Sequence, residues 1–129
     1  STDLGSLLLR IPKRELITAQ SADTVEAAIA NMKAKGISQL PVQDDGRLVG
    51  IVTEHDLLGK LVEGRASLSS AVAEVMFRTV HTIHRDQDAG CLLEVFARVE
   101  VGLVVDDEGA LCGRITRMDL VDYLATKPS

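Results

Sequence analysis

The chain has few aromatic residues and few cysteines, and these shortages exclude several classes of protein. Its 129 residues include no tryptophan, one tyrosine, two phenylalanines and two cysteines. So few aromatic side chains offer little stacking surface to single-stranded bases, and a net charge of −5 disfavours duplex binding, so no nucleic-acid partner is expected. The apolar runs are only strand-sized, so no membrane span is expected either.

The two cysteines predict neither a disulfide framework nor a metal cluster. Cys91 and Cys112 have no Cys-x-x-Cys or Cys/His spacing and stand among apolar neighbours, which is typical of free buried thiols. A reducing location is implied, and we expect the cytoplasm. The chain begins at Ser1 rather than Met, which suggests a trimmed chain or a piece of a larger protein.

Two stretches of the sequence repeat each other at a spacing of 63 residues. Gly46-Arg-Leu-Val-Gly-Ile-Val-Thr-Glu-His-Asp-Leu57 is matched by Gly109-Ala-Leu-Cys-Gly-Arg-Ile-Thr-Arg-Met-Asp-Leu120. An internal repeat indicates two copies of one structural unit. Because domains of about 60 residues are marginal when they fold alone, we expect the copies to share a core.

The first copy is predicted to run β-α-β-β-α. Asp23 and Glu26 have the spacing of a capping box, which starts a helix that Gly36 ends. Strands over residues 39–43 and 48–53 follow, separated by a turn at 44–46, and a second helix ends at Gly64. The inward positions of that helix are expected to be Leu57, Leu58, Leu61 and Val62.

The second copy is predicted to repeat this order. Asp86 is expected to start its first helix, and strands over residues 101–105 and 111–116 flank a turn at 107–109. Ile17 and Val80 are expected on the opening strands, each preceded by a short helix, over 3–9 and 68–77. The inward helix positions are expected to be Leu92, Leu93, Phe96, Leu120, Val121 and Leu124.

The predicted fold class is therefore α/β (α+β), with two pseudo-twofold-related β-α-β-β-α repeats packed sheet to sheet. Helices can cover only one face of each three-stranded sheet, so the other faces are expected to meet. Residues 1–66 form the first repeat with its N-terminal helix, residues 67–129 form the second, and together they make one module.

The tandem pattern resembles the cystathionine β-synthase (CBS) domain pair, or Bateman module. Its first part is Ile37-Ser-Gln-Leu-Pro-Val42, followed by a turn and by Gly-x-x-x-Gly-hydrophobic-hydrophobic-Thr-x-x-Asp-Leu, with Arg114 departing at one hydrophobic position. Residues 37–58 and 115–124 look, more narrowly, like the C-terminal regulatory tail of bacterial cystathionine β-synthases.

The resemblance implies a non-catalytic regulatory module. Such pairs bind an adenosyl ligand (AMP, ADP, ATP or S-adenosylmethionine) in the cleft between the repeats, form homodimers, and modulate a fused or associated enzyme, channel or transporter. No cofactor is expected to be required. Neither a nucleophile elbow nor a Walker loop occurs, which also favours a non-enzyme. The alternative is a structural or dimerisation module without a ligand.

The motifs Thr53-x-x-Asp56 and Thr116-x-x-Asp119 permit two interpretations. Their spacing is that of a helix capping box, which is a purely structural role. A helix N-terminus also suits a phosphate, to which the threonine can donate, while the aspartate accepts from ribose hydroxyls. The two roles are compatible.

The resemblance also implies an apolar slot for adenine on the opening and middle strands. Val104 stands where the family usually has proline, and the alternative role for the whole set is ordinary sheet core. The slot residues are Ala19, Leu40 and Pro41 in the first copy, and Thr82, Ile83, Gly102, Leu103 and Val104 in the second.

The two candidate sites differ in charge. Glu54 follows Thr53, whereas Arg117 follows Thr116 and Arg114 stands two residues before it. We hypothesise that Thr116, Arg117 and Asp119 form the main anionic-nucleotide site. The first site would then be empty or suit S-adenosylmethionine, and the alternative is that these charges are simply solvated.

His81 and His84 raise the question of a metal site. Side chains three positions apart on a strand face opposite ways, and the sequence indicates no third ligand, so no metal site is predicted.

Overall fold

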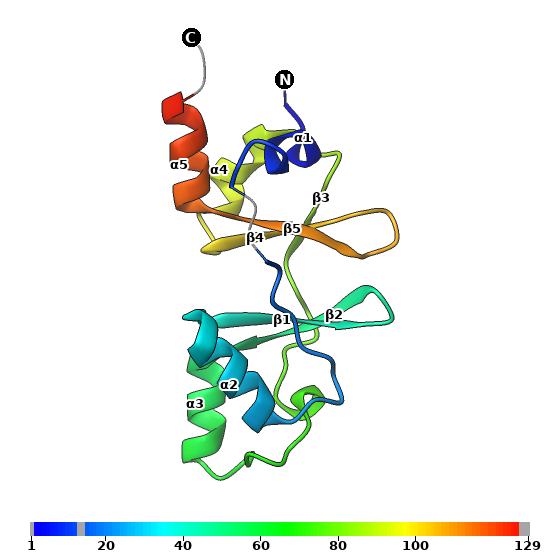
Figure 1. The fold of residues 1–129 in the computed structure, drawn as a ribbon, viewed down its shortest axis with the longest axis vertical. Coiled ribbons are helices and arrows are strands. Elements are labelled where there is room, and N and C mark those ends of the chain that lie inside the picture. Colours follow the sequence, from blue (N-terminus) through cyan, green and yellow to red (C-terminus); the bar gives the residue numbers. More distant parts are fainter. Residues whose placement is uncertain (1, 13–14, 127–129) are drawn as a thin grey trace. The chain divides into compact units, whose positions relative to one another are not determined.

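A computed structural model describes residues 2–12 and 15–126 of the chain (Figure 1). The chain divides into two compact units, residues 17–80 and residues 1–16 together with 81–129. Both units combine helices with a small sheet, so the predicted mixed α/β class is confirmed. Among the described residues, no helix is long and apolar enough to cross a bilayer.

The unit of residues 17–80 packs two helices against a hairpin. Its elements are α2 (Val25–Lys35), β1 (Gln39–Asp44), β2 (Arg47–Thr53), α3 (Glu54–Val62) and the 3₁₀ turn η1 (Val72–Glu74). β1 and β2 are antiparallel, with Leu40 opposite Val52, and Ala19 adds a parallel bridge to Val42. The strand predictions over 39–43 and 48–53 are thus confirmed to within one residue.

Helix α2 begins one residue later than predicted. Thr24 is its N-cap, with Oγ1 accepting from the Ala27 N–H at 3.1 Å, and Gly36 ends it in the left-handed conformation at φ 62°. Asp23 instead accepts from the Gln20 N–H at 2.9 Å, which fixes the approach to the helix. The capping box predicted from Asp23 and Glu26 was therefore wrong, although the helix is present.

The other unit contains a three-stranded sheet. Its elements are α1 (Leu4–Leu8), β3 (Thr82–His84), the 3₁₀ turn η2 (Ala89–Cys91), α4 (Leu92–Val95), β4 (Val101–Val105), β5 (Leu111–Thr116) and α5 (Arg117–Thr126). β3 runs parallel to β4, and β5 runs antiparallel to it. Asp88, not Asp86, caps the first helical segment, by accepting from the Gly90 N–H.

The N-terminal helix joins the unit that holds the second repeat. Leu4 and Leu7 of α1 are fully buried in one cluster with Ile83, Leu92 and other apolar side chains. The main chain agrees, since the Leu4 N–H donates to the Gln87 carbonyl at 2.9 Å. The compact units therefore group the residues differently from the sequence repeats, which were expected to meet at residues 66 and 67.

Residues 68–77 cover the first repeat in the same way, but they are not the predicted helix. Their helical part is only the short turn η1, whose Val72 is fully buried and donates its N–H to the Asp23 carbonyl at 2.7 Å.

Several helix positions expected to face inward are exposed. Leu57 is buried on α3, whereas Leu58 and Val62 are 61% and 77% exposed. α4 is only one turn long, so Leu93 also points outward, and α5 buries little beyond its first turn. The apolar stripe on these helices is wider than the single sheet face beneath them. The predictions were wrong for Leu58, Val62, Leu93, Val121 and Leu124.

The repeat spacing is not constant in the structure. Thr24 and Asp88, which are 64 residues apart, are equivalent N-caps, so the opening segments follow a spacing of 64 rather than 63. Ala19, which bridges Val42, then matches Ile83, which pairs with Val104. Neither Ile17 nor Val80 lies in a strand, so both predicted strand positions were wrong.

The second hairpin is one residue longer than the first. Asp44 pairs with Arg47 across a two-residue turn, whereas Asp106 donates its N–H to the Ala110 carbonyl across three residues. A three-residue loop with glycine at its left-handed last position is a common hairpin form, and Gly109 has φ 79°. Leu103, not Val104, therefore occupies the place of Pro41: Pro41 lies opposite Ile51, and Leu103 lies opposite Arg114.

Candidate functional site

The first Thr-x-x-Asp motif makes half of a capping box. Thr53 ends β2 and caps α3, with Oγ1 accepting from the Asp56 N–H at 3.2 Å. The Asp56 carboxylate turns to Lys60 instead of back to the cap, and Oδ2 lies 2.9 Å from Lys60 Nζ. That contact is off the hydrogen-bonding direction, since Oδ2 accepts no hydrogen bond within the described chain. Asp56 therefore serves an ion pair on one face of α3.

The second motif makes a complete capping box. The Asp119 N–H donates to Thr116 Oγ1 at 3.1 Å, and Asp119 Oδ2 accepts from the Thr116 N–H at 2.8 Å. Asp119 is only 5% exposed. The same sequence pattern thus gives a buried, reciprocally bonded carboxylate in one repeat and an ion-paired one in the other.

Four side chains of the second repeat share one sheet face. Thr82 pairs with Leu103, and Leu103 lies opposite Arg114, so these three residues form a row across β3, β4 and β5. Thr116 stands two residues beyond Arg114 and therefore projects on the same side. The row combines an apolar residue, a cation and two hydroxyls.

Most of the predicted slot residues lie on the other face, inside the cores. Ala19 and Leu40 belong to one buried cluster, and Ile83 and Val104 belong to the other. Gly102 projects toward the same side as Val104, because an added Cβ would lie 3.1 Å from Ile83 Cδ1. Pro41, Thr82 and Leu103 are the slot residues that strand alternation directs away from these clusters.

The two arginines near Thr116 have different surroundings. The Arg117 guanidinium donates to the Phe96 carbonyl at 2.6 Å and lies 3.5 Å from the Val99 carbonyl, so it caps the end of α4. Arg114 Nε is buried and has no hydrogen-bond partner among the described residues. A buried N–H without an acceptor is costly, so Arg114 is the cation that lacks a structural explanation.

Sequence reasoning missed Thr18, which matches Thr82 once the opening segments are aligned at 64 residues. The signal was present in the paired N-caps Thr24 and Asp88, which share that spacing. Thr18 is half-buried just before the Ala19 bridge.

The cysteines are free and half-buried. Burial raises the pKa of both thiols, with the carboxylates of Asp88 and Asp106 adding to the effect at Cys91 and Cys112 respectively. Both are therefore protonated at neutral pH and poor nucleophiles.

Two tandem matches to a known domain account for this geometry. Residues 8–63 and 72–126 each match the CBS domain. The chain belongs to the CBS-domain family. The predicted tandem CBS pair is thus confirmed, and the two matches correspond to the two Thr-x-x-Asp repeats.

Solved CBS structures share the fold over nearly the whole chain. A CBS-domain protein from Burkholderia ambifaria MC40-6 is 32% identical, with a TM-score of 0.75, and the match covers 99% of this chain and 98% of that one. The CBS domain pair of protein MJ0100, solved in complex with 5′-methylthioadenosine and S-adenosyl-L-methionine, is 26% identical with a TM-score of 0.75, over 98% of both chains.

Curated relatives include longer enzymes. The inosine-5′-monophosphate dehydrogenase of Methanocaldococcus jannaschii is 37% identical over 111 residues, which are 84% of this chain and 21% of the enzyme. That of Thermoplasma acidophilum is 34% identical over 110 residues, again 21% of the enzyme. This CBS pair therefore spans about a fifth of these two relatives.

Proposed function

We propose that this CBS pair is a regulatory module that binds an adenosyl ligand and modulates an enzyme or transporter fused to it or associated with it. The MJ0100 pair, solved with two adenosyl compounds, and the dehydrogenases that contain a similar segment support this role. The chain itself is proposed to be non-catalytic and to require no cofactor. The proposed location remains the cytoplasm.

Arg114 carries the proposal for an anionic nucleotide such as AMP, ADP or ATP. Its buried, unpartnered Nε shares a sheet face with Thr82, Leu103 and Thr116. An anionic phosphate oxygen would satisfy this donor, and charge-assisted hydrogen bonds of this kind are among the strongest in proteins. Leu103 would contact the adenine, and the hydroxyls of Thr82 and Thr116 would bind polar ligand atoms.

Asp119 and Arg117 have secondary roles in the proposed site. The Asp119 carboxylate lies at the start of α5, where it would accept from the ribose. Arg117 would have to leave the Phe96 carbonyl to reach a phosphate, so we assign it long-range charge rather than direct contact. This revises the hypothesis that placed Arg117 in the site.

The first repeat is proposed to suit a ligand without phosphate, such as S-adenosylmethionine. Ile51 stands where the second repeat has Arg114, and the exposed Glu54 adds negative charge near Thr53. A cationic sulfonium would meet less repulsion there than a phosphate. Pro41 and the newly identified Thr18 would line this site together with Asp56.

Calorimetric titration of AMP and S-adenosylmethionine tests the assignment. Arg114→Ile installs the residue of the first repeat and should weaken AMP binding by about 10-fold to 100-fold, as expected for a lost hydrogen bond to a charged group. Arg117→Ala is the matched control and should change AMP affinity much less. Equal losses in Asp119→Ala and Asp56→Ala would contradict a difference between the sites. No binding of AMP, ADP, ATP or S-adenosylmethionine would favour the ligand-free structural module.

We also propose that a second copy of the chain covers the exposed helix faces, as the predicted homodimer requires. Leu58 lines a groove of about 410 Å³ between α2 and α3 together with Ile29 and Met32, and Val62 is exposed farther along α3. Sedimentation of wild-type protein should show a dimer, and Leu58→Glu should shift it to monomer. Val121 and Leu124 of α5 are a second exposed set, and a monomeric wild type would overturn the assignment.

A further inference from the structure

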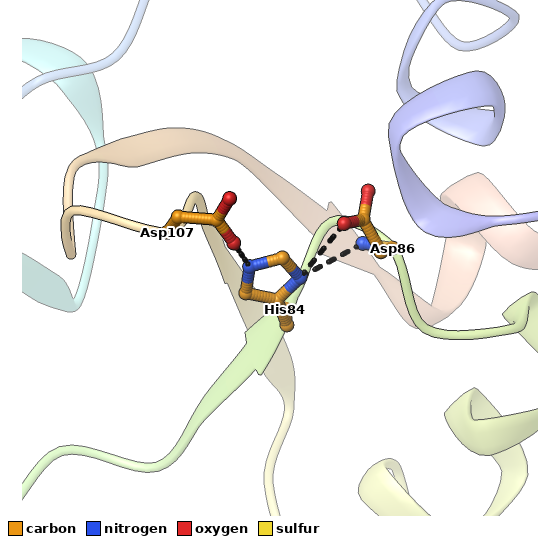
Figure 2. Close-up of side chains that lie close together, drawn as sticks. All are labelled: His84, Asp86 and Asp107. Atoms are coloured by element: carbon orange, nitrogen blue, oxygen red, sulfur yellow. Dashed lines mark hydrogen bonds and ion pairs between the residues drawn. The ribbon is translucent and has the colours of Figure 1, made fainter.

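We propose that His84, Asp86 and Asp107 form a binding site for a divalent transition-metal ion, with zinc as the reference ion (Figure 2). One ring nitrogen of His84 and one carboxylate oxygen of each aspartate lie within 4.8 Å of one another. The site lies within one unit and is separate from the face that carries Arg114. It therefore does not depend on the proposed nucleotide function.

The sheet brings the three side chains together. His84 is the last residue of β3 and pairs in parallel with Val105, the last residue of β4. The carboxyl ends of the two strands thus meet, and Asp86 and Asp107 each follow two residues later. His84 Nε2 lies 2.6 Å from Asp107 Oδ1, and Nδ1 lies 3.7 Å from Asp86 Oδ2.

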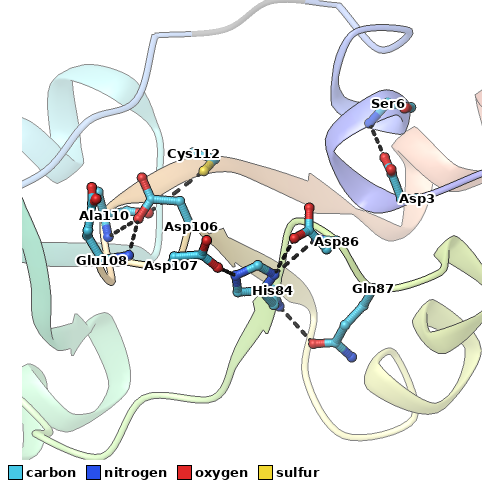
Figure 3. A network of polar contacts seen from close by, with 10 residues as sticks. All are labelled: Asp3, Ser6, His84, Asp86, Gln87, Asp106, Asp107, Glu108, Ala110 and Cys112. Atoms are coloured by element: carbon cyan, nitrogen blue, oxygen red, sulfur yellow. Dashed lines mark hydrogen bonds and ion pairs between the residues drawn. The ribbon is translucent and has the colours of Figure 1, made fainter.

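Side chains other than Asp86 and Asp107 accept the nearby backbone N–H hydrogen bonds (Figure 3). Gln87 Oε1 accepts from the His84 N–H at 2.8 Å. Asp106 accepts from the N–H groups of Glu108 and Ala110, at 2.9 and 3.0 Å, and so fixes the hairpin turn. The Asp86 and Asp107 side chains are 75% and 87% exposed and are oriented toward the imidazole.

The first repeat lacks this cluster although its backbone is alike. At the spacing of 64 residues, Gln20 matches His84 and Ala22 matches Asp86, because the Gln20 N–H donates to Asp23 just as the His84 N–H donates to Gln87. Asp45 follows Asp44 as Asp107 follows Asp106, but it stands in a two-residue turn instead of a three-residue one. Neither the strand ends nor the hairpin fold requires the three side chains of the second repeat.

The donor set suits a borderline divalent ion. One imidazole and two carboxylates, with water in a fourth position, match the ligand types of zinc. Asp107 lies against Nε2, whereas Asp86 lies against Nδ1, which also accepts from the Asp86 N–H at 3.1 Å. The imidazole would therefore have to turn and release that hydrogen bond before one ion could take all three ligands, which lie about 3.4 Å apart around a tetrahedral zinc. The Arg85 guanidinium, next to His84 in the sequence, lies near Gly5 of α1.

Zinc titration of the full chain in competition with a chromogenic chelator tests the site. Wild-type protein should bind one zinc per chain, and Co²⁺ should give visible d–d absorption. His84→Gln and Asp86→Ala install the residues of the first repeat and should each weaken zinc binding by at least about tenfold. Asp107→Asn keeps an acceptor for the imidazole and should also weaken it. A purely structural bridge would not respond in this way.

Controls separate this site from other binding. His81→Gln and the double variant Cys91→Ser/Cys112→Ser should retain stoichiometric zinc, and His84→Gln should leave AMP titrations unchanged. Equal zinc affinity in wild type and His84→Gln would overturn the proposal, as would absence of stoichiometric binding by wild type.

Discussion

The aspartates of the two Thr-x-x-Asp motifs make different contacts in the two repeats. In the second repeat, Asp119 is buried and exchanges hydrogen bonds with Thr116, whereas in the first repeat Asp56 pairs with Lys60. Lys60 also donates to the Val75 carbonyl at 3.2 Å and lies 5.7 Å from the centre of the Phe77 ring. The first repeat thus ties its aspartate to the segment that covers it. A shared motif specifies the helix start, and the neighbouring segment decides what the carboxylate contacts.

The largest expected difference is in stability and concerns the two segments that cover the cores, α1 in one unit and residues 68–77 in the other. Leu7→Ala on α1 should lower the free energy of unfolding by about 3 kcal/mol, because it leaves a cavity in a fully buried cluster. Urea unfolding measures the loss, and hydrogen exchange should show weaker protection in residues 81–126. Val72→Ala, which removes less volume, should instead weaken protection in residues 17–80. Leu9→Ala is the control, since Leu9 is 80% exposed, and a loss equal to that of Leu7→Ala would contradict the assignment.

The equivalent glycines Gly50 and Gly113 should show the next largest difference in stability between the repeats. A Cβ on Gly50 would lie 2.8 Å from the Phe77 carbonyl oxygen, which is fixed by main-chain hydrogen bonds with Ile51. A Cβ on Gly113 would lie 2.8 Å from Leu8 Cδ2, the end of a flexible side chain. Gly50→Ala should therefore cost about 3 kcal/mol and Gly113→Ala about 1 kcal/mol. Thermal unfolding measures both, and the reverse order would show that the covering segment moves more easily in the first repeat.

The two aspartates should differ in stability as well as in ligand binding. Without ligand, Asp119→Ala should cost about 1–2 kcal/mol, because it leaves the Thr116 N–H without its acceptor. Asp56→Ala removes a partly exposed ion pair and should cost about 0.5 kcal/mol. Denaturant unfolding checks the order. Raising the salt concentration should reduce only the Asp56 effect, and a salt-sensitive Asp119 effect would contradict the cap assignment.

The smallest effect is expected at the start of the hairpins. Hydrogen bonds from the Ser21 hydroxyl and N–H lower the pKa of Asp44, whereas backbone N–H groups of Ala110 and Glu108 lower that of Asp106. Because each folded-state pKa is depressed, the stabilisation is present at neutral pH and is lost as the pH falls through that pKa. Ser21→Ala should raise the pKa of Asp44 and leave that of Asp106 unchanged. Carboxyl NMR titration measures both, and a shift at Asp106 would contradict local control.

Local signals explain why much of the fold was predictable. The four hairpin strands follow from short β-branched runs bounded by Asp-Gly and Glu-Gly turns, and α2 follows from its apolar period and Gly36. The partner of α1 was not predictable, because it depends on contacts with residues more than 70 positions away. The change of spacing from 63 to 64 was missed because the expected helix starts, Asp23 and Asp86, are 63 residues apart, whereas the actual N-caps Thr24 and Asp88 are 64 apart.

The same limit applies to the candidate site. The caps at Thr53 and Thr116 follow from four-residue spacing, and the structure contains both. The direction of the arginine side chains does not follow from the sequence. The carbonyl oxygen that accepts from Arg117 lies just after α4, some 20 residues earlier in the chain. His84 shows the same dependence, since Asp107 reaches it only through the parallel pairing of β3 with β4.

Helix α1 packs with the unit that contains residues 81–129, and this has a consequence for the order in which parts of the chain are buried during synthesis. Residues 17–80 form a continuous unit that is complete once residue 80 has left the ribosome, whereas α1 finds its core partners only after β3, α4 and β5 have been made. Chains are synthesised from the N-terminus at about 5–20 residues per second, so the apolar face of α1 waits for several seconds without its core. Helix α1 is thus made before residues 17–80 but buried after them.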